Sequence, residues 1–174
     1  MFYFGIKSLC NMKILFIQTG GTIDKEYPKN KNGWAFEIGK PAIIKMIQKV
    51  PFELDYRCIE LMKKDSTEMK STDLEELLQT CKECKENNIV ITHGTDTILN
   101  TAKKLSVITN KTIILTGSFL PYAFKETDAE FNLGMAISGA QTLNNGIYLS
   151  LNGLIGKHEQ FYRNEISGKY LIQK

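Results

Sequence analysis

Apolar runs alternate with segments of helical periodicity along most of the chain. Residues 13–19, 88–94, 111–118 and 146–153 are mainly apolar and end in threonine, serine or glycine. Such runs are typical of strands that are buried on both faces of a parallel sheet. Apolar and polar residues alternate in part over 52–61, which predicts a further strand. The helical spacing of apolar residues predicts helices at 41–50, 71–87, 96–108 and 127–143.

This order of elements predicts an α/β fold, a three-layer sandwich around a mostly parallel sheet of the Rossmann-like or flavodoxin-like type. Residues 20–33 are polar and predict a long loop, and residues 160–174 predict a short hairpin or an extended arm. A length of 174 residues suits one domain with a full core. We place that domain at residues 12–174 and interpret residues 1–11 as an amino-terminal extension ahead of a second methionine, Met12.

Composition narrows the class of protein. Hydrophobic residues make up 43% of the sequence and charged residues 24%, which is ordinary for a soluble globular protein. The net charge of +3 is small and the charges of both signs are interspersed, so we expect neither nucleic acid nor a membrane as a partner. No apolar run approaches the length of a membrane span, and Lys7 interrupts the apolar start, which argues against a signal peptide. We expect a cytoplasmic protein.

Two of the four cysteines, Cys81 and Cys84, form a CxxC pair inside a predicted helix. A zinc or redox site would need further ligands or a strand-loop-helix context, and the sequence offers no second cysteine or histidine pair. The alternative is a pair of reduced helix cysteines in a reducing compartment. We favour that interpretation and predict no metal and no cofactor.

Glycine turns with hydroxyl side chains follow three of the predicted strands. They are Thr19-Gly20-Gly21-Thr22, His93-Gly94-Thr95-Asp96 and Thr116-Gly117-Ser118. Ligands of parallel sheets bind at the carboxyl ends of the strands, so these turns are expected to meet at one edge. A threonine there becomes a nucleophile when it has a base and donors for the developing oxyanion, which makes Thr22 and Thr95 candidates and Asp96 an anchor for a cation. Alternatively, the threonines only cap helices.

Together with these turns, several further motifs resemble the bacterial-type L-asparaginases, a family that includes the amidase subunit of an archaeal glutamyl-tRNA amidotransferase. They are TGGTI at 19–23, KDSTEM at 64–69, THGTDT at 92–97, LTGS at 115–118, DAEFNLG at 128–134 and LNG at 151–153. The resemblance covers about residues 13–165 and only the family's amino-terminal domain. Full-length members add a smaller second α/β domain, for which this sequence has no room, so it resembles a short, single-domain form.

The resemblance implies an amidohydrolase that converts L-asparagine to L-aspartate and ammonia through an acyl-enzyme, with glutamine as a second substrate. Thr22 corresponds to the nucleophile, and Thr95, Asp96 and a lysine form a second catalytic group. Ser66 would bind the substrate α-carboxylate and Asp96 the α-amino group. The implied substrate-binding residues are Gly21, Asp65, Ser66, Thr67, Gly94 and Ser118. A homo-oligomer is also implied.

Three departures from the family put turnover in question. The family lysine aligns near Arg163, which keeps its proton near neutral pH and cannot act as a base; Lys157 is an alternative if the register shifts. The tyrosine of the family's mobile loop aligns near Phe36, and Tyr27 could replace it. Thr67 stands where the family has a glutamine, and the glutamate that a neighbouring subunit's second domain supplies has no source here.

These departures leave two other functions open, a catalytically impaired or partner-dependent amino-acid-binding module and a hydrolase of a larger amide or ester. Several polar residues also have two interpretations. His93 could act as a base but is typical of a packing histidine at a strand end, and His158 is a weaker candidate. Asp128 and Asn132 could order the nearby loop or simply cap a helix. Trp34 and Phe36 could cover the site or pack a hairpin.

Overall fold

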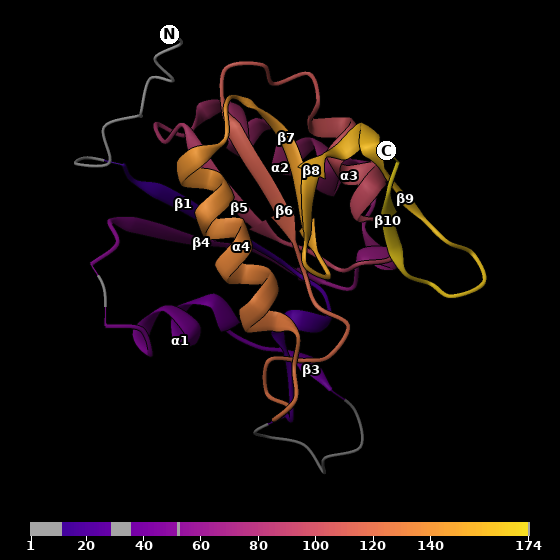
Figure 1. The fold of residues 1–174 in the computed structure, drawn as a ribbon. Coiled ribbons are helices and arrows are strands. Elements are labelled where there is room, and N and C mark those ends of the chain that lie inside the picture. Colours follow the sequence, from indigo (N-terminus) through magenta and orange to yellow (C-terminus); the bar gives the residue numbers. More distant parts are fainter. Residues whose placement is uncertain (1–11, 29–35, 52, 174) are drawn as a thin grey trace, which may run out of the picture.

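The computed structural model describes residues 12–28, 36–51 and 53–173. Its centre is a six-stranded sheet with the order β4-β1-β5-β6-β7-β8 (Figure 1). Neighbouring strands from β4 to β7 are parallel, and β8 pairs antiparallel with β7 at the edge. The strands are β1 (Ile14–Gly20), β4 (Tyr56–Lys64), β5 (Asn88–Thr92), β6 (Thr112–Thr116), β7 (Gly146–Leu151) and β8 (Leu154–Lys157).

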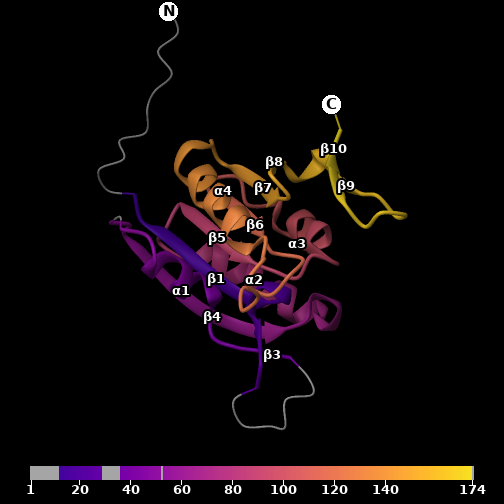
Figure 2. The same cartoon turned by 60° about the horizontal axis from the view of Figure 1, so that its bottom comes forward.

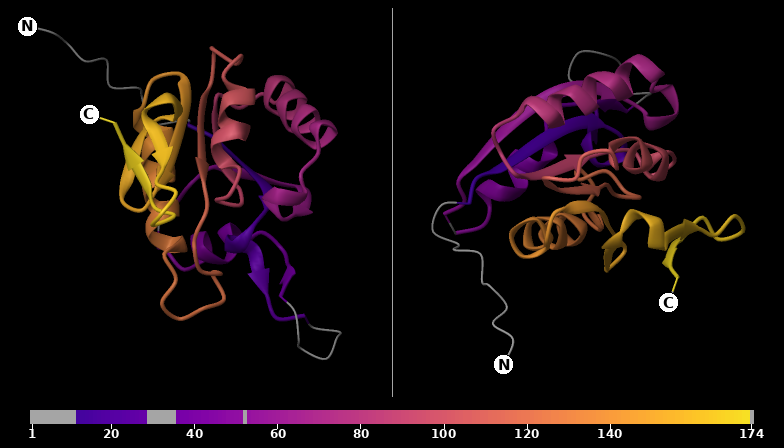
Figure 3. Two further views of the ribbon diagram at one scale, coloured as in Figure 1. Left: turned by 90° about the vertical axis from the view of Figure 1, so that its right-hand side faces the viewer. Right: turned by 90° about the horizontal axis from the view of Figure 1, so that it is seen from above.

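Helices cover both faces of this sheet, which confirms the predicted three-layer α/β sandwich. Helices α2 (Ser71–Glu83) and α3 (Ile98–Leu105) pack on one face, and α1 (Ala42–Gln48) and α4 (Ala129–Thr142) pack on the other (Figure 3). Side chains of β1 alternate between the two resulting cores, since Leu15 and Ile17 face the first and Ile14 and Phe16 the second. The central strands are therefore apolar at successive positions, as their sequences indicate.

Three details of the predicted elements are wrong. Strand β4 overlaps the predicted span 52–61 but begins four residues later, at Tyr56, and ends three residues later, at Lys64. Strand β8 was not predicted, because its four residues directly follow a turn and are too few to show a strand pattern. The predicted loop 20–33 contains the 3-10 helix η2 (Thr22–Asp24) and β2 (Lys25–Glu26), which pairs antiparallel with β3 (Glu37–Ile38).

The carboxy-terminal residues form the hairpin that the sequence predicted as one of two alternatives. Strands β9 (Phe161–Arg163) and β10 (Tyr170–Ile172) are antiparallel and form a separate two-stranded sheet. The hairpin projects from the side of the sandwich that carries α3 (Figure 2). In this hairpin, Phe161 and Tyr170 are 6% and 2% exposed and pack into the core beneath α2 and α3.

The proposed extension at residues 1–11 and the residue Trp34 lie outside the described part of the protein. Among the helices that the structure describes, none has the length and apolar character needed to cross a membrane.

Candidate active site

The glycine turns meet at the carboxyl edge of the sheet because glycine lets their backbones touch. Gly21 has φ 82°, and a Cβ atom there would lie 2.3 Å from the Gly94 nitrogen. A Cβ on Gly94 would lie 2.5 Å from the Ser66 hydroxyl oxygen. A Cβ on Gly117 would lie 2.3 Å from the His93 carbonyl oxygen. The turns after β1, β5 and β6 are thus in direct contact, as the sequence led us to expect, and the turn after β4 joins them through Ser66.

The two threonines of the first turn have different environments. The Thr19 hydroxyl is buried and donates to the Thr92 carbonyl at 2.8 Å, so it joins the ends of β1 and β5. Thr22 begins the 3-10 helix η2 and is half-buried, and its carbonyl accepts the backbone N–H of Lys25. Within the described residues the Thr22 hydroxyl has no hydrogen-bond partner. Thr19 therefore has a structural role, and Thr22 presents a hydroxyl available for chemistry.

Ser66 lies directly beside Gly94 and is buried at 3% exposure. Its hydroxyl oxygen has no hydrogen-bond partner among the described residues. A buried hydroxyl without a partner is costly, and a bound ligand with a carboxylate or amide would satisfy it. The backbone carbonyl of Ser66 accepts the Thr97 hydroxyl at 2.9 Å, which ties this turn to the start of α3.

Asp65 and Thr67 flank this serine. The Lys25 ammonium donates to Asp65 at 2.8 Å and holds the pKa of that carboxyl below its usual range. The Thr67 hydroxyl donates to the same carboxylate at 3.2 Å. Both side chains are therefore engaged within the turn. Lys25 links it to η2, so the Thr22 and Ser66 segments are joined by an ion pair as well as by the glycine contacts.

The carboxy-terminal hairpin brings Arg163 to Asp96. One guanidinium nitrogen, Nη1, donates to the Asp96 carboxylate at 2.7 Å, and Nε donates to the Gly168 carbonyl at 3.1 Å. The hydroxyl of Tyr170, which lies opposite Arg163 in the hairpin, donates to the Thr95 backbone carbonyl. The cation that faces the Thr95-Asp96 turn is thus an arginine, fixed by a buried tyrosine beside it.

The alternative cation, Lys157, is wrong as a partner for this turn. It pairs with Tyr148 in the middle of β7, and β8 runs antiparallel, so Lys157 lies away from the carboxyl edge. The neighbouring His158 contacts the Ile147 carbonyl through Nδ1 at 3.3 Å, which is also near the opposite end of β7. Neither residue lies at the carboxyl edge.

His93 has the environment of a packing residue. It is 0% exposed, and burial lowers its pKa to about 4, so the ring is neutral at physiological pH. Nδ1 lies 2.8 Å from the Gly94 carbonyl, which only accepts, so Nδ1 carries the proton. Nε2 then accepts the Thr101 hydroxyl at 2.9 Å. Both ring nitrogens hold the turn in place, and neither is free to take a proton from a nucleophile.

Sequence reasoning missed Asp24, the last residue of η2. It is 3% exposed, and its carboxylate accepts the Ala42 backbone N–H at 2.8 Å and the Thr92 hydroxyl at 3.3 Å. Burial raises its pKa to about 6. Asp24 therefore joins the Thr22 turn to the start of α1 and the end of β5. A lone aspartate in a polar segment gives no signal of such distant partners.

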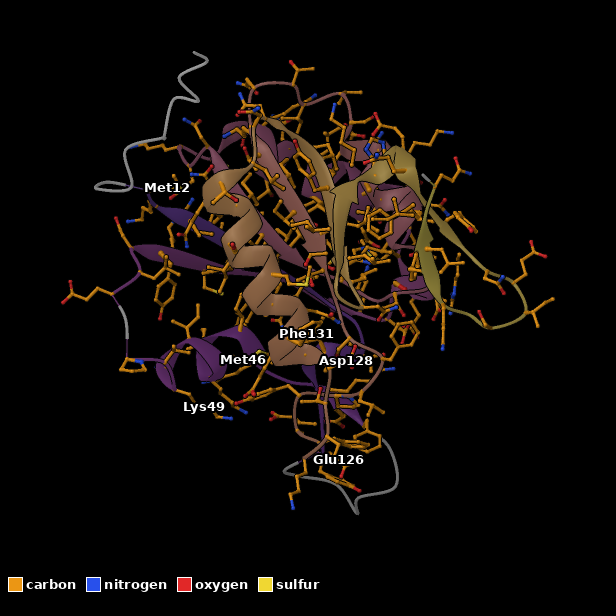
Figure 4. The ribbon with its side chains drawn as sticks, in the orientation of Figure 1. Met12, Met46, Lys49, Glu126, Asp128 and Phe131 are labelled. Carbon is orange, nitrogen blue, oxygen red and sulfur yellow. The ribbon has the colours of Figure 1, made fainter. Side chains whose placement is uncertain are left out.

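Asp128 and Asn132 order the loops after β6 and β7, which was one of their two predicted roles. The Asp128 carboxylate accepts the backbone N–H groups of Phe119 and Leu120 at 3.0 Å each. Asp128 stands at the beginning of α4, where the loop from β6 arrives (Figure 4). Buried Asn132 donates to the Gly117 carbonyl at 3.0 Å. These contacts fix the backbone around Ser118.

Ser118 itself is buried, and its hydroxyl donates to the Leu120 carbonyl at 2.5 Å. In this arrangement the hydroxyl stabilises the loop that Asp128 also holds. A substrate would meet the backbone of Ser118 rather than an unengaged hydroxyl.

Three exposed aromatic rings cluster beside the short β2–β3 ladder. The rings of Tyr27 and Phe36 are 4.8 Å apart, and Phe36 lies 5.5 Å from Phe124. Tyr27 therefore stands beside the position that the family tyrosine aligns with, as its alternative role requires. Phe36 packs in this cluster, as one of its two predicted roles would have it.

The CxxC pair, Cys81 and Cys84, lies at the end of α2. Cys84 Sγ contacts the Cys81 carbonyl at 3.3 Å, and the buried ammonium of Lys111 donates to the Cys84 carbonyl at 2.6 Å. Both cysteines are free thiols. Over the described ranges, no group of three or more His, Cys, Asp or Glu residues could hold a metal ion.

Comparison with known proteins identifies relatives of this arrangement. Residues 13–165 match the family model for the amino-terminal domain of asparaginase. The glutaminase-asparaginase of Acinetobacter glutaminasificans is 29% identical over 154 residues, 82% of this chain and 46% of that protein. The L-asparaginase of Thermococcus kodakarensis is 32% identical over 147 residues, 80% of this chain and 44% of that protein.

Solved structures of asparaginases have a similar fold. The solved structure of the thermostable L-asparaginase from Thermococcus kodakarensis superposes with a TM-score of 0.77 at 26% identity, covering 92% of this chain and 51% of that one. This protein therefore spans about half the length of the relatives that it matches.

Proposed function

Because this chain belongs to the asparaginase family through its amino-terminal domain, we propose that it hydrolyses the side-chain amide of L-asparagine to L-aspartate and ammonia. Glutamine is the second substrate to test. The observation that carries the proposal is the contact of Gly21 with Gly94. It supports the proposal because it brings the turn that carries Thr22 against the turn that carries Thr95 and Asp96, and Gly94 also lies against the buried Ser66 hydroxyl, which has no partner among the described residues.

In the proposed reaction, the Thr22 oxygen attacks the amide carbon and the C–N bond breaks. The threonine proton passes to the leaving nitrogen, so ammonia departs and an ester remains on Thr22. Water then attacks this ester, releasing aspartate and restoring the hydroxyl. Backbone N–H groups of the glycine turns are suited to stabilise the oxyanion in both steps. Arg163 stays protonated, so its role is to orient Asp96 and offset negative charge.

The same turns supply the proposed substrate contacts. The buried Ser66 hydroxyl donates to the α-carboxylate, which would remove the cost of its missing partner. Asp96 faces the α-nitrogen. The remaining wall of the site consists of turn residues that lie within this edge: Gly21, Asp65, Thr67, Gly94 and Ser118.

The experiment that tests the proposal is ammonia release from asparagine by the purified protein and by Thr22→Ala. We expect the variant to lose at least about a thousandfold in kcat, as removal of a nucleophile does, with an unchanged thermal midpoint. Thr22→Ser keeps a hydroxyl and is the matched control, which we expect to retain measurable turnover. Equal rates for the wild type and Thr22→Ala would exclude Thr22 as the nucleophile.

A second candidate function is an amino-acid-binding module, or a half-enzyme that needs a partner. It is favoured by Arg163 in the ion pair with Asp96, where the family pattern has a lysine, and by Phe36. Calorimetric titration with asparagine and aspartate separates the two functions. Binding without turnover at any pH would favour the module, and turnover would favour the hydrolase.

The proposal includes a homo-oligomer in the cytoplasm. A second copy would cover the carboxyl edge, where the exposed aromatic residues Tyr27, Phe36, Phe119 and Phe124 lie. The free thiols Cys81 and Cys84 are compatible with a reducing compartment. Light scattering of the purified protein would establish its oligomeric state.

A further inference from the structure

A cavity of about 530 Å³ lies between the carboxy-terminal hairpin and the loops that follow β6 and β7. It is separate from the residues to which the proposed reaction assigns a role. Its walls come from Phe119, Asn152, Leu154, Ser167, Lys169, Tyr170 and Leu171. A volume of this size is within the range of small-molecule sites.

The cavity adjoins the Thr95-Asp96 turn through Tyr170. This side chain is 2% exposed, lines the cavity, and donates its hydroxyl to the Thr95 carbonyl. Another lining residue, Phe119, follows Ser118 directly and its backbone is fixed by the Asp128 carboxylate at 3.0 Å. Both residues therefore adjoin the proposed catalytic edge, Tyr170 through its contact with Thr95 and Phe119 as the neighbour of Ser118 in the sequence.

The chemistry of the walls selects an apolar ligand that carries an anion. Phe119, Leu154 and Leu171 supply apolar surface. The Lys169 ammonium is exposed and forms no ion pair with the residues that the structure describes. An apolar pocket with a lysine in its lining suits a short hydrocarbon segment that ends in a carboxylate.

The neighbouring Asp96 is the residue proposed to face the α-nitrogen at the other end of this ligand. Its carboxylate is held by the Arg163 guanidinium at 2.7 Å, so its negative charge is already offset. The guanidinium contacts only Oδ1, so Asp96 can still accept a second donor, but the positive charge beside it weakens its attraction for a free α-ammonium. An acylated α-nitrogen is neutral and has no need of that charge.

We propose that the natural substrate is asparagine whose α-nitrogen bears a carboxylate-containing acyl group, as in a peptide with an acidic residue before a terminal asparagine. This rests on the proposed amidohydrolase function and names its substrate class. The acyl group occupies the cavity with its carboxylate at Lys169. The bond that breaks is still the C–N bond of the side-chain amide, and ammonia still leaves.

The test compares three substrates on the same enzyme: asparagine, N-butyryl-asparagine and N-succinyl-asparagine. The two acyl groups have the same number of carbons, and only the second carries a carboxylate. We expect kcat/KM to rise at least about tenfold from asparagine to the succinyl compound. The succinyl compound should exceed the butyryl compound about threefold to fivefold, as one exposed charge pair allows.

Two variants assign this preference to the cavity. Lys169→Gln should bring the succinyl-to-butyryl ratio close to one. Leu154→Trp, which fills the cavity, should lower kcat/KM for both acyl compounds at least fivefold relative to asparagine. Lys103→Gln alters an exposed lysine on α3 outside the cavity and should leave both ratios unchanged.

The outcomes separate the two proposals. Faster turnover of free asparagine than of either acyl compound, with ratios that neither cavity variant changes, would overturn the substrate assignment and leave the amidohydrolase intact. Ammonia release from none of the three substrates, together with binding of none of them in calorimetry, would overturn both.

Discussion

The glycine-turn edge and the carboxy-terminal hairpin approach the same aspartate but are held in place in different ways. At the edge, Gly21 and Gly94 touch through their backbones, leaving no room even for a methyl group. The hairpin is fixed to Thr95 and Asp96 by one tyrosine hydroxyl and one half-buried arginine. Contacts between backbones tolerate almost no change of sequence, whereas contacts between side chains can be exchanged one at a time. Arg163, which the sequence resemblance aligns with a family lysine, falls in the second region.

The largest expected effect breaks the glycine contact itself. Gly21→Ala would place a Cβ 2.3 Å from the Gly94 nitrogen at a residue with φ 82°. Since backbone atoms must move and an alanine is strained at this φ, we expect a loss of about 3 to 5 kcal/mol in the free energy of unfolding. Urea denaturation measures this loss.

Gly134→Ala is the matched control. Gly134 lies within α4, and a Cβ there would meet nothing within 4 Å. Alanine has a better helix propensity than glycine, so this variant should gain up to about 1 kcal/mol. Equal effects of the two substitutions would show that the edge is not packed as tightly as described.

The next prediction uses the two buried titratable groups beneath the edge, Asp24 and His93. The pKa of Asp24 is raised from 3.8 to about 6, so its contribution to stability is full below pH 3.8 and is lost as the pH rises to about 6. The pKa of His93 is lowered from 6.5 to about 4, so its contribution is full above pH 6.5 and is lost as the pH falls to about 4. Each shift corresponds to about 3 kcal/mol, with opposite sign.

Between pH 4 and 6 the two groups therefore change the free energy of unfolding with pH in opposite directions, so their two slopes oppose each other. Asp24→Asn removes one of them, and its free energy of unfolding should fall relative to the wild type as the pH is lowered from 6.5 to 4. His93→Asn should show the reverse trend. Urea denaturation at several pH values measures both slopes. Parallel curves for the wild type and both variants would contradict the assigned shifts.

Asp24 and His93 also show what could and could not be predicted from the sequence. The motif turns, the central strands and the helices were predictable because local features of the sequence mark them. These features are the spacing of apolar residues, the glycines and the hydroxyl residues. The contact of His93 with Thr101 was compatible with the packing interpretation. Asp24 was not predictable, because its partners Ala42 and Thr92 are 18 and 68 residues away in the sequence. Burial that arises from distant segments leaves no periodic signal.

The hairpin region was predictable only in outline. Arg163 could be named from its alignment, and the short hairpin from its length, but β8, which precedes it, was missed. The choice between Arg163 and Lys157 depended on the direction of that strand, which turns Lys157 away from the carboxyl edge. Four residues are too few to establish a strand period, so only the three-dimensional pairing settles this choice.

A smaller effect is expected from the buried contact of the hairpin. Tyr170→Phe removes the hydroxyl that donates to the Thr95 carbonyl and leaves that carbonyl without this donor. We expect a loss of about 1 to 2 kcal/mol in the free energy of unfolding. Tyr162→Phe, in the same hairpin at 40% exposure, is the control and should change stability by less than about 0.5 kcal/mol. A loss as large as that of Gly21→Ala would remove the contrast between the two regions.

The smallest effect on stability is expected from Arg163→Lys. The ion pair with Asp96 is between side chains that are 35% and 51% exposed, so its contribution is at most about 1 kcal/mol. Unlike arginine, lysine can lose its proton within the accessible pH range. If the second catalytic group needs a base, Arg163→Lys should add a rise in kcat at alkaline pH that the wild type lacks, while urea denaturation remains nearly unchanged. An identical pH profile for both enzymes would show that the arginine only holds the hairpin against Asp96, and that the base lies elsewhere at the glycine-turn edge.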